Sequence, residues 1–168
     1  PEDRDAVVTV SHTFIATIEA ISQAGASTEF VDIDERTYCM SPVSLDEYLS
    51  SCAKDAATGR PLGKRTGKPI KAVLPVHLYG QPADMRALEA LAAHHGLALV
   101  EDAAQAHLAT AEGRPVGTIG VAGAFSFYPT KNLGALGDGG AVVTRDAALA
   151  ARVKRLRNGG QVGGAVFR

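Results

Sequence analysis

Short apolar runs rich in β-branched residues alternate along this chain with stretches whose apolar residues recur every three or four positions. The runs predict buried strands and the stretches predict helices. Strands are expected at residues 6–10, 28–33, 70–76 and 97–100, and the helices between them at 11–24, 45–53 and 82–95. Such alternation is typical of a three-layer α/β fold, a mostly parallel sheet with helices on both faces.

The second half of the chain continues the pattern with more glycine. Two further strands are expected at residues 123–128 and 140–144, followed by a helix that Asp146 caps and that runs through Leu156. Residues 56–71 hold three glycines, two prolines and five basic side chains, and are expected to form an exposed loop. No internal repeat is evident.

Composition narrows the classes of function. The chain has 168 residues, the length of one domain, and a net charge of −1, which gives no electrostatic reason to bind nucleic acid or an anionic membrane. A small-molecule partner fits better. Cys39 and Cys52 are too far apart for a metal-binding pair and are interpreted as reduced thiols. No apolar run reaches membrane-spanning length and no signal peptide is evident, so a cytoplasmic location is expected.

An acid at a strand end and a lysine in a glycine-rich turn are the candidates for chemistry. The strand at residues 97–100 runs out into Glu101 and Asp102, and ligands of open α/β sheets gather at such carboxyl ends. The strand that ends before Pro129 delivers Lys131 into a turn rich in glycine. The turn is not a nucleotide-binding phosphate loop, because it leads into a strand and not into a helix.

The sequence motifs around these residues resemble those of a known family. Residues 101–107 (EDAAQAH), 125–132 (FSFYPTKN) and 137–140 (GDGG) are similar in order and spacing to the DegT/DnrJ/EryC1/StrS aminotransferases. The likeness extends upstream through residues 11–17 and 76–80. Members of that family are pyridoxal-phosphate (PLP) enzymes that aminate keto sugars, which are often nucleotide-linked. The resemblance implies PLP as cofactor and the large-domain fold of fold-type I PLP enzymes.

The resemblance also implies that more protein is needed than these 168 residues. Family members are longer and carry a second, C-terminal domain. Residues 1–168 are therefore interpreted as the central part of the PLP-binding large domain, without the upstream phosphate turn and without the small domain. A homodimer with shared active sites is the expected assembly.

Lys131 is the expected Schiff-base lysine. An amine attacks an aldehyde only when it is neutral, so the site must favour the unprotonated form, and a dry pocket lined by Phe125, Phe127 and Ala135 is expected to do this. The alternative is an ordinary surface lysine. In the family, replacement of this lysine by histidine gives dehydratases, so Lys131 favours amination.

Asp102 resembles the partner of the cofactor's pyridine nitrogen. A carboxylate there keeps the ring protonated, and the protonated ring is the electron sink of the reaction. The alternative is a helix N-cap formed by the same side chain. Glu101, its neighbour on the strand, is expected to face the opposite side of the sheet and is the weaker candidate.

Three more residues match cofactor contacts of the family. Gln105 corresponds to the contact with the ring oxygen, and Ser126 to a phosphate ligand, against the alternative of a solvent-facing strand serine. Phe14 aligns with an aromatic residue that stacks on the ring, against the alternative of a core residue in a helix. His94, His95 and His107 are interpreted as structural, with no metal site.

The function implied is transfer of an amino group, with glutamate as the suggested donor, to a keto sugar in amino-sugar, antibiotic or surface-polysaccharide biosynthesis. Two alternatives stay open: a truncated fragment that only folds or binds PLP weakly, and a PLP-dependent sugar dehydratase. A nicotinamide-dependent reductase is disfavoured, because no Gly-x-Gly-x-x-Gly links a first strand to a helix.

Overall fold

The computed structural model describes residues 5–161, which form one main sheet and four α-helices. The sheet has six strands in the order β2-β1-β3-β4-β7-β8. The bounds are β1 (Ala6–Val10), β2 (Ser27–Val31), β3 (Ile70–Val73), β4 (Ala98–Asp102), β7 (Ala122–Ser126) and β8 (Gly140–Val143). All neighbours are parallel except β7 and β8, which are antiparallel. The predicted mostly parallel α/β sheet is confirmed.

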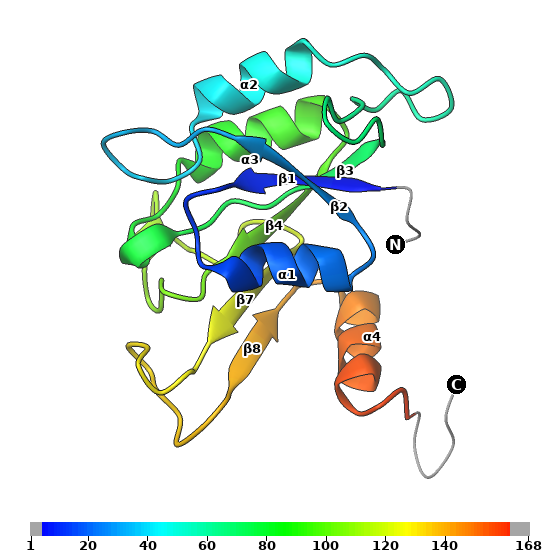
Figure 1. Cartoon of the computed structure of the whole chain (residues 1–168). Coiled ribbons are helices and arrows are strands. Elements are labelled where there is room, and N and C mark those ends of the chain that lie inside the picture. The colour runs from blue at the N-terminus through cyan, green and yellow to red at the C-terminus, as the bar shows by residue number, and fades with distance from the viewer. Residues whose placement is uncertain (1–4, 162–168) are drawn as a thin grey trace.

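The helices cover both faces of this sheet, as Figure 1 shows. They are α1 (Ile15–Gln23), α2 (Pro42–Ser50), α3 (Met85–His94) and α4 (Ala147–Arg157), with a short 3₁₀ turn η1 (Leu78–Gly80). Helices α2 and α3 lie side by side on one face and α1 lies on the other. A small hairpin of β5 (Thr110–Ala111) and β6 (Arg114–Pro115) stands apart from the sheet. None of the helices within residues 5–161 is long and apolar enough to cross a membrane.

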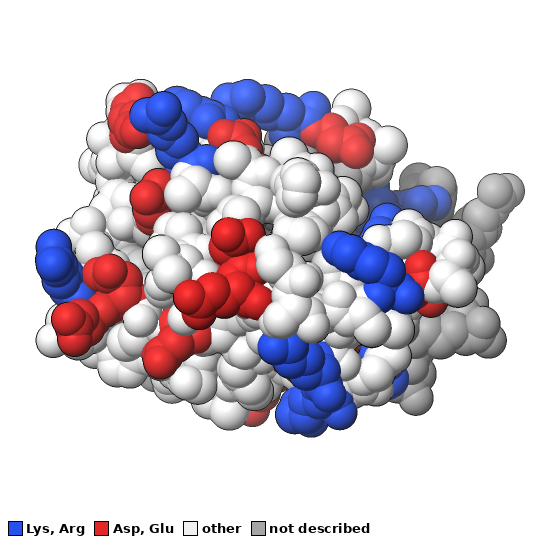
Figure 2. Space-filling view, turned by 90° about the horizontal axis from the view of Figure 1, so that it is seen from above, with Lys and Arg blue, Asp and Glu red and all other residues white. Residues whose placement is uncertain are grey.

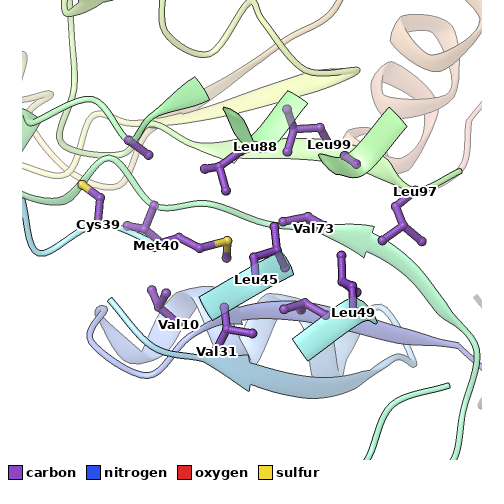
Figure 3. Close-up of a cluster of buried hydrophobic side chains, with 14 of the residues drawn as sticks. Val10, Val31, Cys39, Met40, Leu45, Leu49, Val73, Leu88, Leu97 and Leu99 are labelled. Carbon is purple, nitrogen blue, oxygen red and sulfur yellow. The ribbon is translucent and has the colours of Figure 1, made fainter. Parts of the chain in front are cut away.

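The core lies between the sheet and the α2–α3 layer. Alternate residues of β1, such as Val8 and Val10, are fully buried and pack in one cluster with Leu45 and Leu49 of α2 and Leu88 of α3. Figure 3 shows Val10, Leu45, Leu49 and Leu88 among the side chains that meet in this cluster from strands and helices. Parallel strands are apolar on both faces because helices cover both, and this accounts for the runs that predicted them.

The first helix starts later than predicted. A helix from Ser11 was expected, but α1 begins at Ile15 after an extended Phe14 (φ −71°, ψ 144°). The buried residues of α1 are Thr17 and Ile21, whereas the Phe14 and Ile15 side chains are 71% and 54% exposed. The apolar spacing was therefore read correctly as helical, but Phe14 and Ile15 at its start do not belong to the buried face.

Proline moves two other boundaries. Helix α2 begins at Pro42, earlier than predicted, because Ser41 is its N-cap and accepts a hydrogen bond from the Ser44 N–H (3.2 Å). Strand β3 ends at Val73, before the predicted residue 76. Pro75 has no N–H to continue a ladder, although its carbonyl still accepts from the Asp102 N–H (2.9 Å).

The basic segment after α2 contains a repeat that the sequence analysis missed. Residues 58–62 (TGRPL) and 66–70 (TGKPI) follow the same order of threonine, glycine, base, proline and an apolar residue. Each forms a tight turn with a left-handed glycine, Gly59 at φ 69° and Gly67 at φ 66°. The segment is an ordered double turn. On the face seen in Figure 2, basic and acidic side chains both occur.

The two turns use carboxylates from different places. In the first, the Thr58 N–H and hydroxyl both donate to Asp55 Oδ1, at 2.7 and 2.5 Å. In the second, Thr66 makes the same two bonds to Oε1 of Glu29 on β2, at 2.8 and 2.6 Å. The position equivalent to Asp55 is Gly63, and a side chain there would collide with the Glu29 carboxylate. A strand residue thus replaces the local cap and ties the loop to the sheet.

Candidate active site

A pocket of about 560 Å³ opens at the carboxyl ends of β1, β3 and β4, beside the end of β7. Its size suits a small organic ligand. All five residues predicted for the site line it: Phe14, Asp102, Gln105, Ser126 and Lys131. Its other lining residues are Thr13, Ala16, Thr17, Val76, His77, Leu78, Ala104, Tyr128 and Thr130. Chain segments up to 118 positions apart in sequence meet here because the parallel strands end at one edge.

Asp102 is the last residue of β4, and its carboxylate is held at both oxygens. Oδ2 accepts from the Thr17 hydroxyl at 2.7 Å, and Oδ1 accepts from the Ala104 N–H at 3.1 Å. The second bond resembles the predicted N-cap, but residues 103–109 form turns and not a helix. A carboxylate oxygen can accept more than one hydrogen bond, so Asp102 can still accept a hydrogen bond from a donor in the pocket.

Glu101 faces the opposite side of the sheet, as predicted, and has a structural task. It is fully buried and accepts from the N–H groups of Gly117, Ile119 and Gly120, each at 2.7 Å. Burial raises the pKa of Glu101, but hydrogen bonds from His77 and these backbone groups outweigh it and hold the pKa below its ordinary value. The carboxylate therefore pins the loop that leads into β7.

His77 extends this network towards the pocket. Its Nδ1 accepts from the Ala83 N–H at 3.1 Å, so Nε2 carries the proton and donates to Glu101 Oε2 at 3.1 Å. The ring is fully buried. The segment between β3 and α3 is thereby joined to β4, which keeps the pocket wall formed by Val76, His77 and Leu78 in place.

Gln105 is oriented by a strained turn. Its Oε1 accepts from the Tyr79 N–H at 2.8 Å, and Tyr79 has a left-handed backbone with φ 57°. A non-glycine residue rarely adopts this conformation, and it is found where surrounding structure enforces it. With its oxygen engaged, the amide has its NH₂ group as the donor available to the pocket.

Lys131 lies half-buried in a compact loop that follows β7. Its N–H donates to the Tyr128 carbonyl at 2.8 Å, and the Ala135 N–H donates to the Phe127 carbonyl at 2.7 Å. A side chain at Gly134 would meet the Pro129 carbonyl at 2.5 Å, so the turn requires glycine there. Within residues 5–161, no hydrogen bond or ion pair engages the Lys131 Nζ.

The expected lining of this lysine by Phe125, Phe127 and Ala135 is wrong. Side chains of a strand alternate between its two faces, so Ser126 enters the pocket while its aromatic neighbours point away. Both phenyl rings lie 5.7 Å from the ring of His107 on the far face. Lys131 instead shares the pocket with Ser126, Tyr128, Thr130 and Asp102.

Ser126 and Phe14 both line the pocket, and their predicted contacts with the cofactor stay predictions. Ser126 faces the pocket, and its oxygen accepts from the Tyr128 N–H at 3.2 Å, so the hydroxyl proton can be donated to a ligand. Phe14 is 71% exposed and lines the pocket, so it is not a core residue. Sequence reasoning missed Thr13 and Thr17. Their spacing of four residues within the similar segment 11–17 was the available signal.

Comparison with known proteins identifies the family. The model of the DegT/DnrJ/EryC1/StrS aminotransferase family matches residues 2–167. The chain belongs to this family. The resemblance based on the sequence motifs around Asp102 and Lys131 is thereby confirmed.

Individual members of the DegT/DnrJ/EryC1/StrS family match closely. A dTDP-3-amino-3,4,6-trideoxy-alpha-D-glucose transaminase of Micromonospora megalomicea subsp. nigra is 50% identical over 153 residues, 91% of this chain and 36% of that protein. The crystal structure of DesV from S. venezuelae in complex with a ketimine intermediate has a TM-score of 0.85 and 43% identity, covering 100% of this chain and 41% of that one.

A second solved structure in the comparison carries a cofactor. NtdA from Bacillus subtilis, with bound cofactor PMP, has a TM-score of 0.80 and 27% identity, covering 100% of this chain and 35% of that one. The chain therefore spans about two fifths of the length of the relatives it matches.

Proposed function

We propose that this chain is the central part of the large domain of a PLP-dependent aminotransferase. Its substrate is a keto sugar, nucleotide-linked as the name of the Micromonospora relative indicates for that enzyme, and glutamate is its amino donor. The observation that carries the proposal is one pocket that gathers Asp102, Gln105, Ser126, Lys131 and an exposed aromatic ring. No pair of these residues by itself would distinguish a cofactor site from a surface cleft.

The side chains of the pocket fit PLP group by group. Lys131 would hold the cofactor covalently through its Nζ, and Asp102 would accept the proton of the ring nitrogen. The free NH₂ of Gln105 would donate to the ring oxygen, and the Ser126 hydroxyl to the phosphate. The exposed Phe14 would stack on the ring. When bound, PLP supplies an electron sink for the substrate carbon that loses a proton.

The residues of this chain then have separate tasks. The Lys131 Nζ would remove the proton from the donor's α-carbon, and in the second half of the transfer it would give a proton to the sugar carbon that receives the amino group. A side chain without a fixed ion pair is suited to this task. Asp102 would hold the ring nitrogen's proton through a carboxylate whose two oxygens are each already oriented by one hydrogen bond. The presence of lysine and not histidine at position 131 supports amination over dehydration.

The remaining parts of the site are proposed to come from outside these residues. The relatives are longer, and family members complete the cofactor's phosphate site with a turn upstream of this region and with a second subunit. We therefore propose a homodimer with shared active sites.

Cys39 and Cys52 are both buried and unpaired, which supports a reducing compartment such as the cytoplasm.

Borohydride reduction of the complete, PLP-loaded protein tests the assignment. The visible absorbance band of the bound cofactor should disappear on reduction, and peptide mapping should place the pyridoxyl group on Lys131. Lys131→Ala should abolish the band, because no amine remains at that position. Lys154→Ala removes an exposed lysine on α4 and should leave the band unchanged. An adduct on any other lysine would refute the proposed role.

A further inference from the structure

We propose that Thr17 and Thr13 form a hydroxyl relay that positions Asp102 for the ring nitrogen of the cofactor, an inference that rests on the proposed function. The Thr13 and Thr17 hydroxyl oxygens lie 2.8 Å apart, and the Thr17 hydroxyl lies 2.7 Å from Asp102 Oδ2. All three residues line the pocket. The two threonines are positioning residues, because they act through the carboxylate.

The direction of the relay follows from the number of protons. An ionised carboxylate only accepts hydrogen bonds, so Thr17 gives its single hydroxyl proton to Asp102. The oxygen of Thr17 can then only accept, and the hydroxyl of Thr13 must be the donor between the two threonines. Each bond polarises the next, which strengthens the bond that reaches the carboxylate.

Burial makes the relay necessary. Thr17 is 6% exposed, so solvent has little access to the Asp102 Oδ2 side that it covers. With Oδ1 held by the Ala104 N–H, the carboxylate is fixed at two points, one at each oxygen. Loss of the Thr17 hydroxyl would release one of these two points.

The relay also connects two cofactor contacts. Phe14 lies between the two threonines in sequence, and its carbonyl accepts from the Thr17 N–H at 3.1 Å. Thr13 precedes α1 and Thr17 lies in its first turn, and the contact between their hydroxyls brings both to the Asp102 side while Phe14 remains exposed beside them. The ring that would stack on the cofactor is thereby set relative to the acid that would face its nitrogen.

The test uses the complete protein loaded with PLP labelled with ¹⁵N in the ring. In Thr17→Val the ring-nitrogen resonance should move towards that of unprotonated pyridine, and kcat should fall about tenfold to a hundredfold with KM for the keto sugar nearly unchanged. Thr17→Ser keeps the hydroxyl and should restore both. Thr13→Val should move the resonance in the same direction by less, and Asp102→Asn should mark the limit.

Thr9→Val is the matched control. It removes another buried threonine hydroxyl, which donates to the Leu74 carbonyl at 2.8 Å outside the pocket, and should not move the resonance. An unchanged resonance in Thr17→Val, or an equal shift in Thr9→Val, would overturn the relay. If Thr17→Val does not fold, an unchanged resonance in Thr13→Val overturns it. Absence of a PLP adduct on Lys131 in the unmutated protein would instead overturn the proposed function.

Discussion

Two neighbouring carboxylates at the end of β4 have opposite tasks, and side-chain alternation along the strand assigns them. Asp102 turns into the pocket and is held by two hydrogen bonds, which leaves it able to accept a third from a ligand. Glu101 turns into the protein and is saturated by three backbone N–H groups and His77. The first is therefore suited to chemistry and the second to stability.

Glu101→Gln should destabilise the complete protein by roughly 1–3 kcal/mol, since the amide NH₂ would face an N–H donor in either orientation. The comparison is with Glu112→Gln, which loses only a loose surface pair with Arg86 at 3.8 Å and should change stability by less than about 1 kcal/mol. Chemical unfolding at neutral pH measures both. Equal stability of the two variants would show that the Glu101 network does not stabilise the fold.

The same substitution should change the dependence of stability on pH. Because the pKa of Glu101 is lowered in the folded state, its ionised form contributes stability that is present above the ordinary pKa of 4.5 and is lost as the pH falls through the lower, folded pKa. Glu101→Gln lacks this group. Its unfolding free energy should therefore decline less steeply on acidification than that of the unmutated protein.

At the scale of elements, the double turn shows how one motif can be completed in two ways. The Asp55 side chain closes the first turn locally, whereas the second borrows the carboxylate of Glu29. Glu29 is 2% exposed and also accepts from the Tyr48 hydroxyl at 2.7 Å, so α2, β2 and the second turn share one buried acid. Hydrogen bonds from Thr66, Tyr48 and the turn's backbone overcome the effect of burial and lower the pKa of Glu29.

Gly63→Ala should show how far the stability of the protein depends on the contact between Glu29 and the second turn. The added methyl group would collide with the Glu29 carboxylate and push it away from Thr66, at a cost of about 1–3 kcal/mol in the free energy of unfolding. Gly137→Ala places a methyl group in open space and should stay within about 0.5 kcal/mol. Thermal or chemical unfolding of the two variants checks this. A Gly63→Ala variant as stable as Gly137→Ala would mean that the Glu29 contact is dispensable.

At the scale of the whole molecule, the two ends of the sheet differ in how well they are covered. Helix α3 buries Met85, Leu88 and Ala92, whereas α4, within the described part of the chain, has no buried residue. Figure 1 shows α4 projecting from the edge of the molecule. On β8, Val142 and Val143 are 50% and 37% exposed. Surface of this kind is normally covered by further protein, which supports the proposed remainder of the domain.

The isolated chain of residues 1–168 should bind PLP weakly and transfer no amino group, because the other proposed parts of the active site are not in it. Amide hydrogen exchange should be faster in α4 than in α3, since α4 lacks buried contacts to protect it. Titration of the purified chain with PLP, followed by an assay with glutamate and a keto sugar, tests the rest. Saturable micromolar binding with measurable amino transfer would show that these residues are sufficient and that the proposed domain organisation is wrong.

The sequence by itself determined the alternating elements, the parallel sheet, the family and five of the residues that line the pocket. These features are local, because an apolar run, a glycine-rich turn or the sequence motif around Lys131 can be recognised without knowing which residues pack against it. The separate orientations of Glu101 and Asp102 also followed from local alternation. Where the prediction failed locally, as at the start of α1, the apolar residues Phe14 and Ile15 proved to be exposed and not in the core.

Only the tertiary structure decided which distant groups meet. Thr17 reaches Asp102 across 85 positions, and Glu29 completes a turn at Thr66 that lies 37 positions away. Phe125 turned out to face His107 and not the lysine. Periodicity and spacing report on neighbours in the chain, whereas these contacts depend on the order of strands in the sheet and on the helix that covers each face.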